Sequence, residues 1–285
     1  VSLTEPNPDI AYISTPFAGF SNQRFLFGPE TKVEFGGYGL NDRTLPDEVE
    51  HLMPDYSLFD CQYSMGFTTR GCIRRCWFCW VPRFEGAIRK HSPIQEFHDP
   101  CHKHVMLLDN NILALAGMFE ATAEYLAENG LTVNISQGID IRLVNERNAG
   151  ILKDLKHASH QSRHAVLHFA YDDSEYKKDL EQGVRRLLQA GFKPRDMMCY
   201  CLAVPGKFQD VYNRVRYVWE TLHIDPFVMV YNKQKCNDLL NDFARWCNRP
   251  QLRKSVPFTE YRCSHHVANL KDKIPRKRGR EGLNG

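Results

Sequence analysis

Long apolar runs are absent from this 285-residue sequence. No stretch of about 18 consecutive apolar residues occurs, so no membrane-spanning helix is expected. The first eight residues have neither the basic start nor the apolar stretch of a secretion signal, and no internal repeat interrupts the chain. A complete G-x-G-x-x-G is also missing, so Gly36, Gly37 and Gly39 predict a tight turn and only weakly a phosphate loop.

What the chain does contain favours a packed α/β protein of a reducing compartment. Hydrophobic residues make up 42% of the sequence, which is ample for a core of this size. Ten cysteines in a chain without an export signal indicate thiols and metal ligands and argue against a disulfide framework. The expected location is the cytoplasm.

The net charge of +3 is unevenly distributed. A short tail nets +4, because six basic side chains oppose Asp272 and Glu281, and the rest of the chain therefore sums to about −1. The six are Lys271, Lys273, Arg276, Lys277, Arg278 and Arg280. This tail is expected to be a solvated end; the alternative is that it binds RNA through the phosphates.

Strand and helix patterns alternate from Cys61 onward, which predicts parallel strands joined by right-handed crossovers. The predicted strands are 63–69, 104–109, 132–136, 165–171, 197–204 and 226–231, and the predicted helices are 111–129, 144–157, 174–190, 207–222 and 234–247. Two further short strands, 9–14 and 31–35, precede them. The predicted fold class is therefore α/β with a small N-terminal α/β segment.

Three cysteines, Cys72, Cys76 and Cys79, form a C-x-x-x-C-x-x-C motif directly after the first predicted strand of this array. Structural zinc almost always takes four protein ligands, so three are one too few for a closed site. A cubane iron–sulfur cluster has four irons, and three thiolates leave one iron open to an outside ligand. The spacing thus favours a 4Fe–4S cluster with one open position.

This motif, with Phe78 before its last cysteine, resembles the signature of the radical S-adenosylmethionine (SAM) superfamily. The resemblance implies a partial (β/α)6 TIM-like barrel, a 4Fe–4S cluster held by the three cysteines, and Phe78 beside the adenine of SAM. It also implies reductive cleavage of SAM to a 5′-deoxyadenosyl radical that takes hydrogen from a substrate. Electrons would come from a low-potential donor of the flavodoxin or ferredoxin type.

The N-terminal segment resembles part of the cobalamin-binding domain that precedes some radical SAM barrels. The histidine motif that holds cobalamin is absent, so cobalamin is not expected. Two strands make no stable sheet alone, so the segment either packs onto the barrel or continues one that begins before Val1. The predicted division is residues 1–60 for this segment, 61–250 for the barrel and 251–285 for an extension with the basic tail.

Polar residues follow the predicted strands, where parallel barrels place their functional groups. By resemblance and chemistry, Asp109 or Asn110 would accept from the SAM ammonium, Arg142 would pair with its carboxylate, and Gln137 and Asp140 would bind the ribose. Tyr171 is expected to point toward the same mouth. The alternative is that Asp109 and Asp172 simply cap helices.

The motif also departs from the superfamily pattern. Asp-Asn-Asn at 109–111 replaces the common Gly-Gly-Glu after the second strand, a pattern related to the subgroup that includes methylthiotransferases. Those enzymes carry three further cysteines in front of the motif, whereas only Cys61 stands there in this chain. The substrate stays open. The competing function is a non-catalytic metal-binding or electron-transfer iron–sulfur protein, associated with RNA through the tail.

Overall fold

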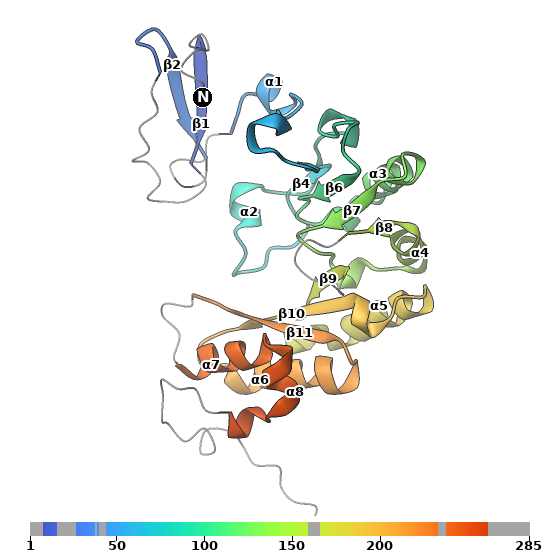
Figure 1. The fold of residues 1–285 in the computed structure, drawn as a ribbon. Coiled ribbons are helices and arrows are strands. Elements are labelled where there is room, and N and C mark those ends of the chain that lie inside the picture. The colour runs from blue at the N-terminus through green and yellow to red at the C-terminus, as the bar shows by residue number, and fades with distance from the viewer. Residues whose placement is uncertain are drawn as a thin grey trace, which may run out of the picture.

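The computed structural model describes residues 8–15, 27–37, 39, 44–158, 166–232 and 238–261 of the chain. These residues form a mixed α/β fold in which parallel strands alternate with helices (Figure 1). The basic tail lies outside the described residues, so the structure says nothing of its RNA alternative. None of the described helices is long and apolar enough to cross a membrane.

Two parallel sheets form the centre of the fold. The first has the order β3-β6-β7-β8 and the second the order β11-β10-β9. A single parallel bridge between Ile139 and Phe169 joins them in the described residues. The strands are β3 (Ser64–Gly66), β6 (His104–Leu107), β7 (Thr132–Ile135), β8 (Lys156–His157), β9 (Leu167–Ala170), β10 (Met197–Ala203) and β11 (Asp225–Val230).

The helices cover the strands as the hydrophobic pattern predicts. In the view of Figure 1, α3, α4 and α5 line up along one side of the strands and α2 lies on the opposite side. A π-helical turn, Tyr217–Thr221, continues α6. The helices are α2 (Val81–Phe84), α3 (Ala116–Glu128), α4 (Glu146–Asp154), α5 (Lys177–Gln189), α6 (Phe208–Arg216), α7 (Asp238–Cys247) and α8 (Pro250–Ser255).

The core lies between these helices and the two sheets. Its fully buried members come from both strands and helices, for example Leu107 in β6, Leu180 in α5 and Phe243 in α7. Phe258 and Tyr261, which follow α8, are also buried in it. The described start of the predicted 251–285 extension thus packs on the same core as the strand array.

Two helix starts differ from the sequence predictions. The carboxylate of Asp109 caps no helix, since α3 begins at Ala116 without a side-chain cap. After β9, Asp173 and not Asp172 accepts the backbone N–H of Glu175. In both places the side chain expected at a cap is used elsewhere in the structure.

The N-terminal segment forms a parallel pair of strands, β1 (Ile10–Ser14) and β2 (Lys32–Gly36), as predicted. The short helix α1 (Asp47–Glu50) follows, and a small antiparallel pair, β4 (Thr69–Arg70) and β5 (Arg89–Lys90), brackets the cysteine motif. Glu50 lies 3.1 Å from the guanidinium of Arg70, which ties α1 to β4.

A second tie between α1 and the rest of the fold depends on pH. His51 Nδ1 lies 2.6 Å from a carboxylate oxygen of Glu96. The hydrogen bond to Glu96 raises the pKa of His51, with a smaller contribution from Asp47. A raised folded-state pKa gives stability that is present below the unfolded value of about 6.5 and lost as pH rises through the folded value.

We therefore expect the pKa of His51 in the folded protein to lie above that of a histidine in an unfolded peptide. The Glu96→Gln variant should lower the pKa of His51. The measurement is an NMR titration of the histidine ring signals between pH 5 and pH 9. His91 is the internal comparison, because burial and then Arg70 lower its pKa. A His51 pKa that does not change in Glu96→Gln would contradict the ion pair.

Candidate functional site

A cavity of about 590 Å³ lies at the ends of the parallel strands. We call it the strand-end pocket. One wall is the cysteine loop, residues 71–80, and the others are the segments that follow β6, β7, β9 and β10. Eight of the ten predicted site residues and ligands line it: Cys72, Cys76, Phe78, Cys79, Asn110, Gln137, Asp140 and Arg142.

Backbone geometry fixes the start of the cysteine loop. Gly71 has φ +80°, and a Cβ there would lie 2.3 Å from the carbonyl oxygen of Ala87, so only glycine fits. Its N–H donates to Asn110 Oδ1 at 3.0 Å. The side chain of Asn110 thereby holds the loop at the end of β6.

The cysteines lie within electrostatic reach of one another as free thiols. Burial raises the pKa of Cys76, and the charges of Cys79 and Cys72 raise it further while Arg142 opposes them. Cys72 Sγ accepts two weak hydrogen bonds, from the backbone N–H of Arg74 at 3.3 Å and from Asn111 Nδ2 at 3.4 Å. Because a thiol ligand must lose its proton, cluster binding would release protons from this loop.

Single-ion coordination is not formed here. Within the described residues, no group of three His, Cys, Asp or Glu side chains is arranged to hold a metal ion. The predicted convergence of the three sulfurs is therefore not shown. The thiolates of a cubane bind different irons and stand further apart than the ligands of one ion, at about 6–7 Å by analogy with metal–thiolate distances.

Asn111 provides a test of whether the pocket fits SAM. Its side chain is 4% exposed, and its Oδ1 atom is buried without a hydrogen-bond partner in the described part of the chain. Such an orphaned acceptor is costly unless a donor satisfies it. An ammonium group of a bound ligand would do so. The free thiols and this acceptor are therefore the donor set and the polar contact that a cluster with SAM requires.

Asp140 connects the cysteine loop to the segment after β7. It accepts from Arg74 Nε at 2.8 Å and from Arg142 Nε and Nη2 at 2.7 and 3.1 Å. Burial favours the neutral acid, but the hydrogen bonds of Arg142 and Arg74 together outweigh it and lower the pKa of Asp140. Asp140 is thus an ionised anchor for two arginines, which differs from the predicted ribose contact.

Arg142 is also more constrained than predicted. Two of its guanidinium nitrogens are used by Asp140, and the guanidinium lies 4.7 Å from the ring centroid of Tyr176. The side chain still lines the strand-end pocket. It can meet an anionic ligand group through its remaining donors, while Asp140 and Tyr176 hold its plane.

Two predicted SAM contacts do not line the strand-end pocket. Asp109 is fully buried, and its carboxylate accepts four hydrogen bonds of 2.5 to 3.2 Å from the backbone and hydroxyls of Thr68 and Thr69. Tyr171 is 2% exposed, and burial raises the pKa of its hydroxyl to about 12. Both side chains face inward, so neither is retained as a ligand contact.

The pocket has a second polar wall that the sequence reasoning missed. Asp172 lines it, and burial raises the pKa of its carboxyl group. Beside it, Arg214 lies 2.8 Å from Asp210 and donates to the carbonyls of Tyr171 and Leu202. The i,i+4 spacing of Asp210 and Arg214 on an amphipathic helix was the available signal, but it is also typical of an exposed ion pair.

The strands also carry two thiols that the sequence left without a role. Cys199 and Cys201 are fully buried in β10, and burial raises the pKa of Cys199 well above that of a free thiol. Neither lines the strand-end pocket. Both pack in the core as small apolar side chains.

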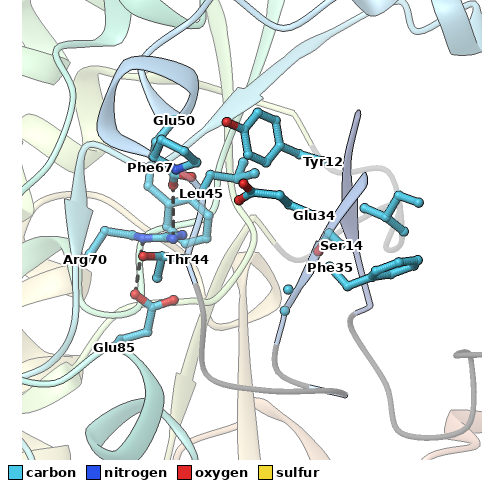
Figure 2. A pocket seen from close by; sticks show the side chains of 14 residues that line it. Tyr12, Ser14, Glu34, Phe35, Thr44, Leu45, Glu50, Phe67, Arg70 and Glu85 are labelled. Atoms are coloured by element: carbon cyan, nitrogen blue, oxygen red, sulfur yellow. Dashed lines mark hydrogen bonds and ion pairs between the residues drawn. The ribbon is translucent and has the colours of Figure 1, made fainter. Parts of the chain in front are cut away.

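A larger cavity of about 740 Å³ lies between the β1–β2 pair and β4. Figure 2 shows Arg70 between the carboxylates of Glu50 and Glu85, with Phe67 nearby. These charges pair among themselves, and no cysteine lines the cavity. The chemistry therefore favours the strand-end pocket as the candidate site.

A scan against protein-family models found no match to this chain, and a search of curated proteins found none either.

Proposed function

We propose that the protein is a radical SAM enzyme whose cluster and cofactor bind in the strand-end pocket. The observation that carries the proposal is the composition of that pocket. Three free thiols of a C-x-x-x-C-x-x-C loop share one cavity with Asn110, Asn111 and Arg142, which come from the ends of two neighbouring parallel strands. A cluster with one open iron requires three thiolates on one side and polar groups for SAM on the other.

Each residue has a role that follows from its contacts. Cys72, Cys76 and Cys79 would hold three irons, and Asn111 would offer its orphaned oxygen to the SAM ammonium. Arg142, held in place by Asp140, would meet the SAM carboxylate. When bound and reduced, the cluster supplies one electron that cleaves SAM into methionine and a 5′-deoxyadenosyl radical, which takes hydrogen from the substrate.

The parallel strands support a partial (β/α)6 barrel as the setting for this chemistry. The strands β3, β6 and β7 adjoin in sequence order in one sheet, with β8 beside β7, and β9, β10 and β11 adjoin in sequence order in the other; the Ile139–Phe169 bridge lies between the two sheets. Functional groups of such barrels lie at the C-terminal ends of the strands. The strand-end pocket lies at those ends.

The competing function, a zinc or electron-transfer protein, would place a fourth protein ligand beside the cysteines. The described residues that line the strand-end pocket include no fourth cysteine and no histidine. They include instead several amides, carboxylates and arginines that a closed cluster would not need. The enzyme is therefore the better supported proposal, with an external flavodoxin- or ferredoxin-type donor supplying electrons.

The deciding experiment is anaerobic reconstitution of the full chain with iron and sulfide, followed by incubation with SAM and dithionite. We expect slow, reductant-dependent formation of 5′-deoxyadenosine, measured by liquid chromatography. A reconstituted protein with a normal cluster spectrum that neither binds SAM nor forms 5′-deoxyadenosine would exclude the enzyme and leave the electron-transfer function.

Arg142→Gln is expected to weaken SAM binding about 10- to 150-fold, since a hydrogen bond to a charged group contributes about 1.5–3 kcal/mol. The visible absorbance of the cluster should stay unchanged, because Arg142 is not an iron ligand. Calorimetric titration with SAM measures the affinity. Arg147→Gln, which removes an exposed arginine paired with Glu120, is the matched control. Equal SAM affinity in both variants would contradict the role of Arg142.

A further inference from the structure

Two large aromatic side chains stand in the open on the cysteine loop. Trp77 is 66% exposed and Trp80 is 64% exposed. Trp80 stacks on Phe84 with ring centroids 5.5 Å apart. Trp77 contacts Tyr231 edge to face at 5.0 Å and also lines the strand-end pocket. Both side chains belong to one ten-residue loop, and large apolar side chains that are exposed together mark binding surfaces in many proteins.

The same segment carries a concentrated positive charge. Residues 70–90 hold Arg70, Arg74, Arg75, Arg83, Arg89 and Lys90 against Glu85 alone, so six positive charges minus one negative give +5. Because the chain nets +3, all other residues sum to −2. Outside the basic tail, the positive charge of the chain is therefore concentrated in residues 70–90, and polyanions would be attracted to this segment.

Four of these basic side chains are available to a partner. Arg75, Arg83, Arg89 and Lys90 are exposed and form no ion pair with any residue of the described ranges. Arg83 lies over the rings of both Trp80 and Phe84, at 5.5 and 5.0 Å. In the sequence, Arg75 precedes Trp77 and Arg83 follows Trp80, so basic side chains bracket the two exposed rings.

We propose that the surface formed by Arg75, Trp77, Trp80 and Arg83, which we call the Trp–Arg surface, binds a single-stranded nucleic acid. Bases stack on aromatic faces with about 1–3 kcal/mol per base, and arginines neutralise the intervening phosphates. An acidic protein would also be attracted, but protein interfaces centre on a contiguous apolar patch. Here two exposed rings lie between Arg75 and Arg83 in the sequence, so one loop supplies both aromatic faces for bases and cations for phosphates.

The position of Trp77 gives this surface a direction. Since Trp77 belongs both to the Trp–Arg surface and to the wall of the strand-end pocket, a strand stacked on it would run along the pocket mouth. Binding itself requires neither SAM cleavage nor a substrate role for the strand. The inference therefore stands or falls separately from the proposed function.

The test uses the full chain, reconstituted anaerobically and left unreduced, with a fluorescein-labelled 12-nucleotide oligoadenylate RNA as the probe. Fluorescence anisotropy measures its Kd. Trp80→Leu is expected to weaken binding about 5- to 150-fold, the equivalent of one lost stacked base. Leu52→Ala is the matched control, because Leu52 is also 64% exposed and lies outside the loop.

Charge is tested by salt dependence. The double variant Arg75→Gln and Arg83→Gln should reduce the slope of log Kd against log salt by about 1.4, since each phosphate contact on a single strand contributes about 0.7. The control is the double variant Lys178→Gln and Arg195→Gln, which removes two exposed cations on α5 and before β10. It should leave the slope of log Kd against log salt unchanged. Iron content and circular dichroism verify that each variant is folded.

The outcomes separate the possible partners. Loss of affinity in Trp80→Leu with a reduced slope in the arginine variant supports the inference. RNA binding that neither variant changes assigns the affinity to the tail and overturns it. If RNA binds neither the wild type nor the Trp80→Leu variant, and a flavodoxin binds the wild type but not the variant, the Trp–Arg surface binds an acidic protein. That result also overturns the inference. Each result is independent of 5′-deoxyadenosine formation.

Discussion

Replacing any one of Cys72, Cys76 or Cys79 with alanine is expected to abolish cluster assembly and 5′-deoxyadenosine formation. Two thiolates cannot hold a cubane in a pocket that offers no other thiol or imidazole among its described lining residues. Loss of activity should exceed about 100-fold, because even groups that only orient metal ligands contribute about 10–100-fold. Iron and sulfide analysis after reconstitution, with the visible spectrum, measures the cluster.

Cys101→Ala is the matched control for this series, because Cys101 is also a free and exposed thiol and lies outside the cysteine loop. It should retain full iron content. A cluster that persists in any of the three loop variants would show that a different ligand completes the site. Equal iron loss in Cys101→Ala would show that the iron is bound nonspecifically.

Asp109→Ala is expected to destabilise the fold by about 4 kcal/mol, a large part of the stability of an ordinary domain. The change leaves four buried donors of Thr68 and Thr69 without an acceptor. For a protein of this size the melting temperature should fall by about 8–16 °C. Differential scanning calorimetry of the wild type and the variant measures the shift.

Asp154→Ala, which removes an exposed carboxylate from α4, should shift the melting temperature by no more than about 2 °C. This comparison also decides between the two roles considered for Asp109. A carboxylate that only contacted SAM would leave the melting temperature of the cofactor-free protein unchanged when removed. A stable Asp109→Ala variant with weak SAM binding would therefore contradict the structural role.

The order of the longer strands and helices was predictable because each of them carries its own periodic signal. Strand β10, for example, is a run of apolar residues from Met197 to Ala203, and α5 places Leu180, Val184 and Leu187 on one face. The two-residue strands β5 and β8 were not predicted, and β8 lies within the predicted helix 144–157. The strand ends were predictable as well, since parallel strands must deliver their C-terminal residues to one side. Asn110, Gln137, Asp140 and Arg142 share one pocket for that reason.

The direction of individual side chains was not predictable from the sequence. Asp109 and Asn110 are adjacent, yet one binds Thr68 and Thr69 inside the fold and the other lines the strand-end pocket. The difference arises from pairing partners far along the chain, which leave no local pattern. Likewise, the sequence offered Asp172 as a cap, but the backbone path brings the carboxylate of its neighbour Asp173 to the N–H of Glu175.

In the described residues, the two sheets are joined by a single backbone bridge, between Ile139 and Phe169. Gly138 lies next to that bridge, where a Cβ would stand 2.6 Å from the carbonyl oxygen of His168. Any larger residue would therefore push the segment after β7 away from β9. Gly138 also lines the strand-end pocket, so a larger residue at this position would change the spacing of the two sheets beside that pocket.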